Sequence, residues 1–132
     1  MKWGFLLTEK GLVLVVEDDP LVSDVIAAAL DDTYATVVVE TSQDALGVLS
    51  RDDVRLMLLD CTLPGGVSPD LLPEADRRGA PVILMSGDPE RIRKISDLPR
   101  PFIRKPFTLA GLLDTVATVL AAGPNPGVTT TR

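Results

Sequence analysis

The chain alternates between short runs of apolar residues and longer stretches in which apolar residues recur every three or four positions. The short runs are rich in β-branched side chains, which is typical of buried strands. They predict five strands, at residues 12–16, 35–39, 54–60, 82–85 and 102–105. The longer stretches have the period of an amphipathic helix. A helix after each strand indicates an α/β fold, a doubly wound parallel sheet with helices on both faces.

Polar residues mark where the helices are expected to begin. Asp19 before Pro20 is a typical start, because the carboxylate caps the first amides and proline suits the first turn. The other expected starts are Thr41 or Ser42, Ser68, Asp88 and Thr108. The last helix is expected to carry one apolar stripe, formed by Leu109, Leu112, Leu113, Val116, Val119 and Leu120.

The pattern predicts one domain between two flanking segments. We expect an N-terminal arm at residues 1–11, the α/β domain at residues 12–122 and a disordered, proline-bearing tail at residues 123–132. A chain of 132 residues is long enough to bury one core of this kind. Its apolar runs are too short to cross a bilayer, so no membrane insertion is expected.

Composition restricts the chemistry further. A formal net charge of −6 argues against general binding to nucleic-acid backbones. The chain contains no histidine, which excludes histidine acid–base catalysis, histidine metal ligation and phosphohistidine formation on this chain. The single cysteine, Cys61, cannot form an internal disulfide and fits a cytoplasmic protein. We interpret it as a small buried thiol rather than a redox sensor.

Reactive side chains follow four of the predicted strands. Carboxyl ends of parallel strands share one edge of the sheet, so this edge should receive Glu17, Asp18, Asp60, Ser86 and Lys105. Three carboxylates in one crevice repel each other unless a cation is present, and oxygen ligands with water favour Mg²⁺. A lysine and a hydroxyl beside them suit a phosphoryl group. This set predicts that Asp60 is a nucleophile that forms an aspartyl phosphate.

Four short motifs occur in order along these strands. They are Val-Leu-Val-Val-Glu-Asp-Asp-Pro at 13–20, Leu-Leu-Asp-x-x-Leu-Pro-Gly at 58–65, Val-Ile-Leu-Met-Ser-Gly at 82–87 and Lys-Pro-Phe at 105–107. Together they resemble the receiver domain of two-component response regulators, such as the chemotaxis receiver. The resemblance covers about residues 12–121 and implies the flavodoxin-like strand order 2-1-3-4-5.

The resemblance assigns a role to each acidic residue at the edge. Asp60 would be the phosphoacceptor. Asp18 would bind Mg²⁺ directly and Glu17 would bind it through water, while Asp60 and the backbone carbonyl of Thr62 would complete the protein ligands. Magnesium is therefore the expected cofactor.

The remaining motif residues would sense the phosphoryl group. By the resemblance, Ser86 would bond a phosphoryl oxygen and Lys105 would pair with it. Phe102 matches the aromatic switch position, whose rotamer follows Ser86. Thr62 and Asp88 match the two variable positions that tune the lifetime of the phosphoryl group, and the Lys105–Pro106 peptide is cis in the family.

The resemblance implies a stand-alone phosphorylation switch. A sensor histidine kinase or a histidine phosphotransfer protein would supply the phosphoryl group, and a downstream protein, rather than DNA or a membrane, would read the result. The chain would catalyse only its own phosphorylation and dephosphorylation, so it is not expected to be an enzyme with a separate substrate. Two alternatives stay open: a pseudo-receiver acting as a constitutive interaction module, and a phosphatase with an aspartyl nucleophile.

Two features depart from the usual receiver pattern, and one of them is Ser68, where the family commonly has a glycine that Gly65 and Gly66 would replace. The segment from Ser86 to Lys105 is shorter than usual, so the fourth helix is expected to be short or distorted. The same segment concentrates basic residues: Arg91, Arg93, Lys94, Arg100, Arg104 and Lys105. Apart from Lys105, which is expected in the site, they form either a solvated face or a basic docking patch on an acidic protein.

Overall fold

The computed structural model describes residues 11–95 and 99–123. The described strands are β1 (Leu12–Val16), β2 (Ala35–Val39), β3 (Val54–Asp60), β4 (Val82–Ser86) and β5 (Phe102–Arg104). The described helices are α2 (Pro20–Leu30), α3 (Ser42–Arg51), α4 (Leu71–Arg77), α5 (Pro89–Ile95) and α6 (Leu109–Ala122). The predicted arm and tail lie outside the described residues, except for Gly11 and Gly123.

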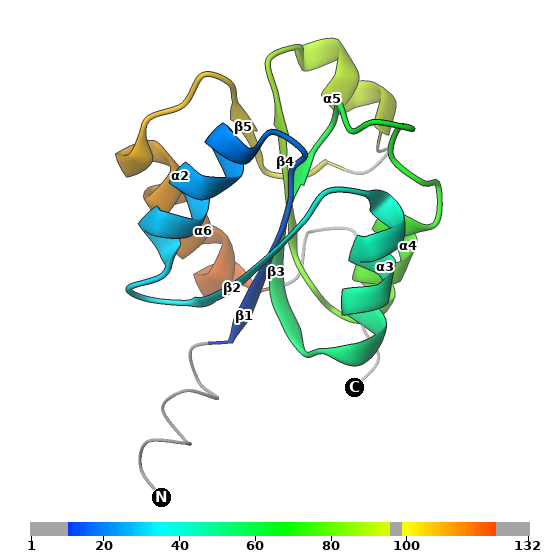
Figure 1. Ribbon diagram of the computed structural model, residues 1–132, viewed down its shortest axis with the longest axis horizontal. Helices are drawn as coiled ribbons and strands as arrows, with labels where there is room; N and C mark the ends of the chain where they lie inside the picture. Colours follow the sequence, from blue (N-terminus) through cyan, green and yellow to red (C-terminus); the bar gives the residue numbers. More distant parts are fainter. Residues whose placement is uncertain (1–10, 96–98, 124–132) are drawn as a thin grey trace, which may run out of the picture.

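All five described strands are parallel and form one sheet in the order β2-β1-β3-β4-β5. Figure 1 shows the sheet between two helical layers, with α2 and α6 on one side and α3, α4 and α5 on the other. This is the doubly wound, flavodoxin-like arrangement, and it confirms the predicted fold class and strand order. Among the described residues, none of the helices is long and apolar enough to cross a membrane.

Alternation along the central strands divides the core in two. In β1, Leu14 and Val16 face the α3–α4 layer, whereas Val13 and Val15 face the α2–α6 layer. All four side chains are fully buried. Strands buried on both faces explain why the sequence reads as continuous apolar runs. The carboxyl ends of the strands are thereby held at one edge by a core on each side.

Most expected helix starts are present. The side chains of Asp19, Thr41 and Thr108 each accept a hydrogen bond from a backbone amide in the first turn of α2, α3 and α6. The expected start at Ser68 is wrong, because α4 begins at Leu71. The Ser68 hydroxyl instead accepts from the Asp70 amide and forms a turn before the helix.

The two helices nearest the C-terminus differ in how they pack. Of the expected stripe on α6, Leu112, Val116 and Val119 are buried, whereas Leu109 and Leu113 are 47% and 39% exposed. Helix α5 has only seven residues and buries none of its side chains. It is short, as expected from the spacing between Ser86 and Lys105.

Candidate functional site

The acidic residues predicted to share an edge do so. Glu17 and Asp18 follow β1, and Asp60 ends the neighbouring strand β3. One carboxylate oxygen from each of the three residues lies within 4.8 Å of the others. Glu17 is 1% and Asp60 2% exposed, while Asp18 is half-buried. The site is therefore a partly enclosed cluster of carboxylates with Asp18 at its mouth.

Asp60 is held by several donors. Its Oδ1 accepts hydrogen bonds from the Thr62 amide (3.0 Å) and the Thr62 hydroxyl (2.9 Å). Its Oδ2 lies 3.5 Å from Nζ of Lys105. Burial acts to raise the pKa of Asp60, but the Thr62 hydrogen bonds and the lysine outweigh it, and the pKa stays below its usual value. Asp60 is therefore ionised at neutral pH.

Lys105 joins two carboxylates. It begins the cis Lys105–Pro106 peptide after β5, and its Nζ forms an ion pair with Oε1 of Glu17 at 2.8 Å. Burial raises the pKa of Glu17, and the nearby Asp60 raises it further. Burial lowers the pKa of Lys105, but its bond to Glu17 and the charge of Asp60 leave it raised overall. The lysine thus remains a cation in the centre of the cluster.

The cluster fits a hard cation. Its described ligand candidates Glu17, Asp18 and Asp60 offer only carboxylate oxygens, which suit Mg²⁺ bound through a few protein groups and water. Asp18, the most exposed of the three, leaves room for water ligands. The predicted contribution of the Thr62 carbonyl stays a prediction.

Ser86 reaches the same edge, but its hydroxyl is engaged elsewhere. Ser86 ends β4 and is 1% exposed. Its Oγ donates to the Asp88 carbonyl at 3.1 Å and accepts from the Asp88 amide at 3.0 Å. Phe102, the predicted switch residue, lies on β5 and is 54% exposed. Both switch assignments therefore stay predictions.

One contact in this region was missed from the sequence. The motifs assign Glu17 to the metal and Lys105 to a phosphoryl group, but they do not pair the two with each other. The two residues follow β1 and β5, which are separated by β3 and β4, so their opposite charges at one edge of the sheet are the only signal in the sequence. The hydrogen-bonded turn between Ser86 and Asp88 agrees with the preference of these residue types for turns.

Comparison with known proteins identifies the family. The sequence profile of the response regulator receiver domain matches residues 13–117. The chain belongs to this family. A curated relative, the regulatory protein VanR of Enterococcus faecium, is 26% identical to the receiver domain over 100 residues, which is 72% of this chain. The chain covers only 43% of VanR.

Solved structures agree with the assignment. The receiver domain of the sensor histidine kinase PA1611 from Pseudomonas aeruginosa is 25% identical, with a TM-score of 0.71 over 84% of this chain and 98% of that one. That structure has a magnesium ion coordinated in its active-site cleft. A response regulator receiver protein from Sinorhizobium medicae has the same fold, with 17% identity and a TM-score of 0.76 over 85% of this chain and 95% of that chain.

Proposed function

We propose that this receiver domain is a phosphorylation switch that accepts a phosphoryl group on Asp60 in a Mg²⁺-dependent reaction. The observation that carries the proposal is one arrangement: an ionised Asp60 whose Oδ2 faces Lys105, with Glu17 and Asp18 beside it. This is the arrangement that an aspartyl nucleophile needs, because it combines a free carboxylate oxygen, a fixed cation and a second carboxylate pair for a metal.

The donor is a phosphohistidine on a sensor kinase or a histidine phosphotransfer protein. Oδ2 of Asp60 attacks phosphorus, the bond from phosphorus to the histidine nitrogen breaks, and the imidazole leaves with its electron pair and takes up a proton. We assign the attack to Oδ2 because Oδ1 is occupied by two hydrogen bonds from Thr62. When bound, Mg²⁺ supplies positive charge at the transferring group.

Chain residues do the remaining work. Lys105 is fixed by its ion pair with Glu17, so its charge is already oriented toward Oδ2 before the phosphoryl group arrives. Thr62 holds the carboxylate of Asp60 in one orientation. Hydrolysis of the acyl phosphate by water returns the free carboxylate, so the chain acts on its own phosphoryl group alone.

Output is proposed to pass through the end of β4. A phosphoryl oxygen on Asp60 offers the Ser86 hydroxyl a charged acceptor in place of the Asp88 carbonyl. Moving that hydroxyl removes a tie on the residue that precedes α5, and Phe102 would change its rotamer with it. The result is read by a downstream protein, as receiver domains do in general.

The test uses a small phosphodonor. The purified chain is incubated with acetyl phosphate, with and without Mg²⁺, and its intact mass is measured. We expect a base-labile gain of one phosphoryl group that requires Mg²⁺ and is absent from Asp60→Asn. Asp19→Asn is a matched control, since Asp19 is exposed and its cap function is retained by asparagine.

Three outcomes would count against the proposal. The first is the absence of any adduct together with no spectral change on adding beryllofluoride, which would favour a pseudo-receiver. The second is an adduct that persists in Asp60→Asn. The third is multiple turnover of an unrelated phosphoester, which would favour a phosphatase.

A further inference from the structure

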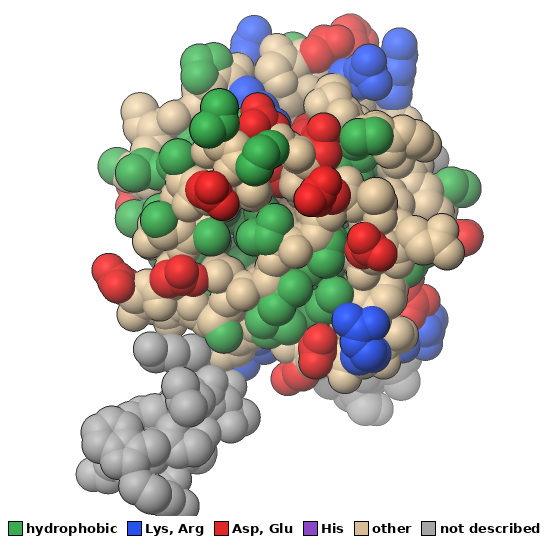
Figure 2. Space-filling model, viewed as in Figure 1, with side chains coloured by type: hydrophobic (Ala, Val, Ile, Leu, Met, Phe, Trp, Pro, Cys, Tyr) green, Lys and Arg blue, Asp and Glu red, His purple; other side chains and the backbone are tan. Residues whose placement is uncertain are grey.

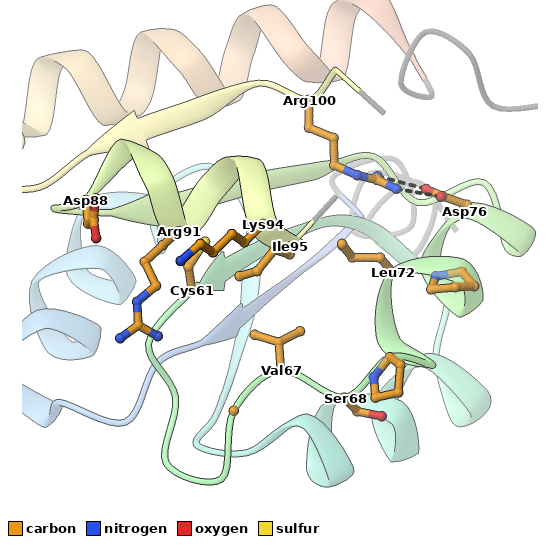
Figure 3. A pocket seen from close by; sticks show the side chains of 13 residues that line it. Cys61, Val67, Ser68, Leu72, Asp76, Asp88, Arg91, Lys94, Ile95 and Arg100 are labelled. Atoms are coloured by element: carbon orange, nitrogen blue, oxygen red, sulfur yellow. Dashed lines mark hydrogen bonds and ion pairs between the residues drawn. The ribbon is translucent and has the colours of Figure 1, made fainter. Parts of the chain in front are cut away.

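A groove opens beside helix α5, on the α3–α4 side of the sheet. It has a volume of about 790 Å³ and lies between α5 and the chain that runs from Gly66 into α4. Figure 3 shows α5 along one wall, with Val67, Ser68 and Leu72 on the other. Asp88 lies at one end of the groove, and the Arg100–Asp76 ion pair lies at the other. A concave site of this size is large enough for a ligand.

Apolar groups line much of the groove. Val67, Pro69, Leu72 and Pro73 contribute from the side of α4, and Ile95 contributes from α5. Ile95 is only partly buried, because α5 rests on the core without burying any of its side chains. An apolar lining left open beside a helix is typical of a surface that a partner covers.

The charged residues that line the groove are Asp76, Asp88, Arg91, Lys94 and Arg100, so the lining carries one net positive charge. Arg100 and Asp76 form a two-pronged ion pair whose side chains are 2% and 18% exposed, so this pair is neutral as a unit. Arg91 and Lys94 also line the groove, and both are exposed. Neither forms an ion pair with another of the described residues. Figure 3 shows both side chains extending from α5 on the side where Cys61 lies.

The third basic residue of α5 behaves differently. Arg93 lies outside the groove lining and forms an ion pair with Glu90, one turn earlier. The basic cluster seen in the sequence is therefore not uniform. Arg93, Arg100 and Lys105 form ion pairs, Arg104 is exposed on β5, and Arg91 and Lys94 line the groove. In Figure 2, Lys and Arg side chains lie over α5 together with acidic side chains, and more acidic side chains are spread across the rest of the visible face.

We propose that the groove beside α5 binds an acidic, amphipathic segment of a partner protein. Its apolar side chains would fill the space between Val67, Leu72 and Ile95, and its carboxylates would pair with Arg91 and Lys94. Charge complementarity selects this occupant. A second copy of the chain is disfavoured because its net charge of −6 makes copies repel. The cations lie along a helix rather than around one point, which suits a peptide with several carboxylates better than a single small anion.

The groove adjoins the phosphoryl site through Cys61 and Asp88 but does not contain its charged cluster. None of the residues Glu17, Asp18, Asp60 and Lys105 lines it. The proposal therefore stands whether or not Asp60 is phosphorylated.

The test selects peptides against the full chain. A phage-displayed library of random peptides, long enough for about four helical turns, is panned on the immobilised protein. We expect enriched sequences in which apolar residues recur at helical spacing between acidic ones. Methyl NMR of the bound state should show the largest shifts at Val67, Leu72 and Ile95.

Charge reversal then decides the role of the groove. Arg91→Glu and Lys94→Glu should each weaken binding of a selected peptide by about tenfold or more. The matched control, Arg93→Glu, makes the same charge change on the same helix but outside the groove, and it should alter the affinity by less than about twofold. All three positions are exposed, so the fold should be retained, which circular dichroism checks.

Several results would overturn the proposal. Selected peptides without acidic residues, equal losses in all three variants, or shifts confined to another surface would do so. Enrichment of no peptide at all would count against it as well. A concentration-dependent dimer in sedimentation that buries the groove residues would assign the groove to a second copy instead.

Discussion

Helices α5 and α6 flank the same strand, β5, in sequence, but they are held by different forces. Helix α6 has 14 residues and buries Leu112, Val116 and Val119 against the sheet. Helix α5 has seven residues and buries none. The polar contacts next to it are the Ser86–Asp88 turn before it and the Arg100–Asp76 ion pair beyond it, and Ile92 and Ile95 pack partly buried against the core. Helix α6 therefore belongs to the core, whereas displacing α5 would expose little buried apolar area.

Matched truncations test this difference most strongly. Leu112→Ala in α6 should lower the free energy of unfolding by about 3 kcal/mol, because it removes a fully buried side chain and leaves a cavity. Ile92→Ala in α5 should lower it by about 1 kcal/mol, because Ile92 is only partly buried. Urea titrations followed by circular dichroism measure both values. Equal losses would show that α5 is part of the core after all.

The reactivity of the Cys61 thiol, which lines the groove, tests whether α5 is displaced. Cys61 is 3% exposed. Burial raises its pKa from 9.0 to about 11, and the neighbouring charge of Asp60 adds to the shift. At pH 8 its alkylation by iodoacetamide should be about 100-fold slower than in the urea-unfolded chain, since the thiolate is the reacting form. The rate should keep rising toward pH 11.

The same reaction distinguishes local from global opening. Cys61 lines the groove together with Arg91 and Lys94 of α5. If displacement of α5 exposes the thiol, the alkylation rate should hardly change in Leu112→Ala. A rate that rises in proportion to the destabilisation would mean that only global unfolding exposes the thiol.

The raised pKa of Cys61 also makes the free energy of unfolding depend on pH. The contribution of the protonated thiol to stability is fully present below pH 9 and is lost as the pH rises through about 11.

The smallest of these effects concerns two ion pairs, one within α5 and one beyond its end. Asp76→Ala should destabilise the chain by about 2 kcal/mol, because it removes the two-pronged partner of a buried guanidinium. Glu90→Ala removes the exposed partner of Arg93 and should change stability by less than about 0.5 kcal/mol. Urea midpoints give both numbers. Indistinguishable midpoints would show that the Arg100–Asp76 pair does not fasten the segment after α5.

The sequence predicted the sheet well, for a physical reason. The central strands β1, β3 and β4 are buried almost throughout on both faces, so their runs of apolar residues are nearly continuous and can be recognised locally. The edge site was predictable for a related reason: once the strands are parallel, Glu17, Asp18, Asp60 and Lys105 must meet at one edge. Their proximity is observed, while their roles in phosphoryl transfer stay predictions.

Contacts between residues distant in sequence could not be predicted. Helix α4 starts three residues after Ser68 because the Ser68 amide is held by the Ser42 hydroxyl at 2.9 Å, a contact across 26 positions. The pairing of Arg100 with Asp76 spans 24 positions, so the basic cluster looked more uniform in the sequence than it is. Local preference cannot reveal either contact, because the folded arrangement brings the groups together.

The Ser86 hydroxyl has one proton and, in the resting chain, one acceptor. It donates to the Asp88 carbonyl, so it cannot donate to a phosphoryl oxygen at the same time. If Asp60 carries a phosphoryl group, the Asp88 carbonyl and the phosphoryl oxygen compete for that proton. Only one of the two hydrogen bonds can then form at a time. By thermodynamic reciprocity, any molecule that binds more tightly when α5 is displaced would then increase the equilibrium constant for phosphorylation by the same factor as phosphorylation strengthens its binding. The proton of the Ser86 hydroxyl would thereby couple the phosphorylation of Asp60 to the binding of a partner at α5.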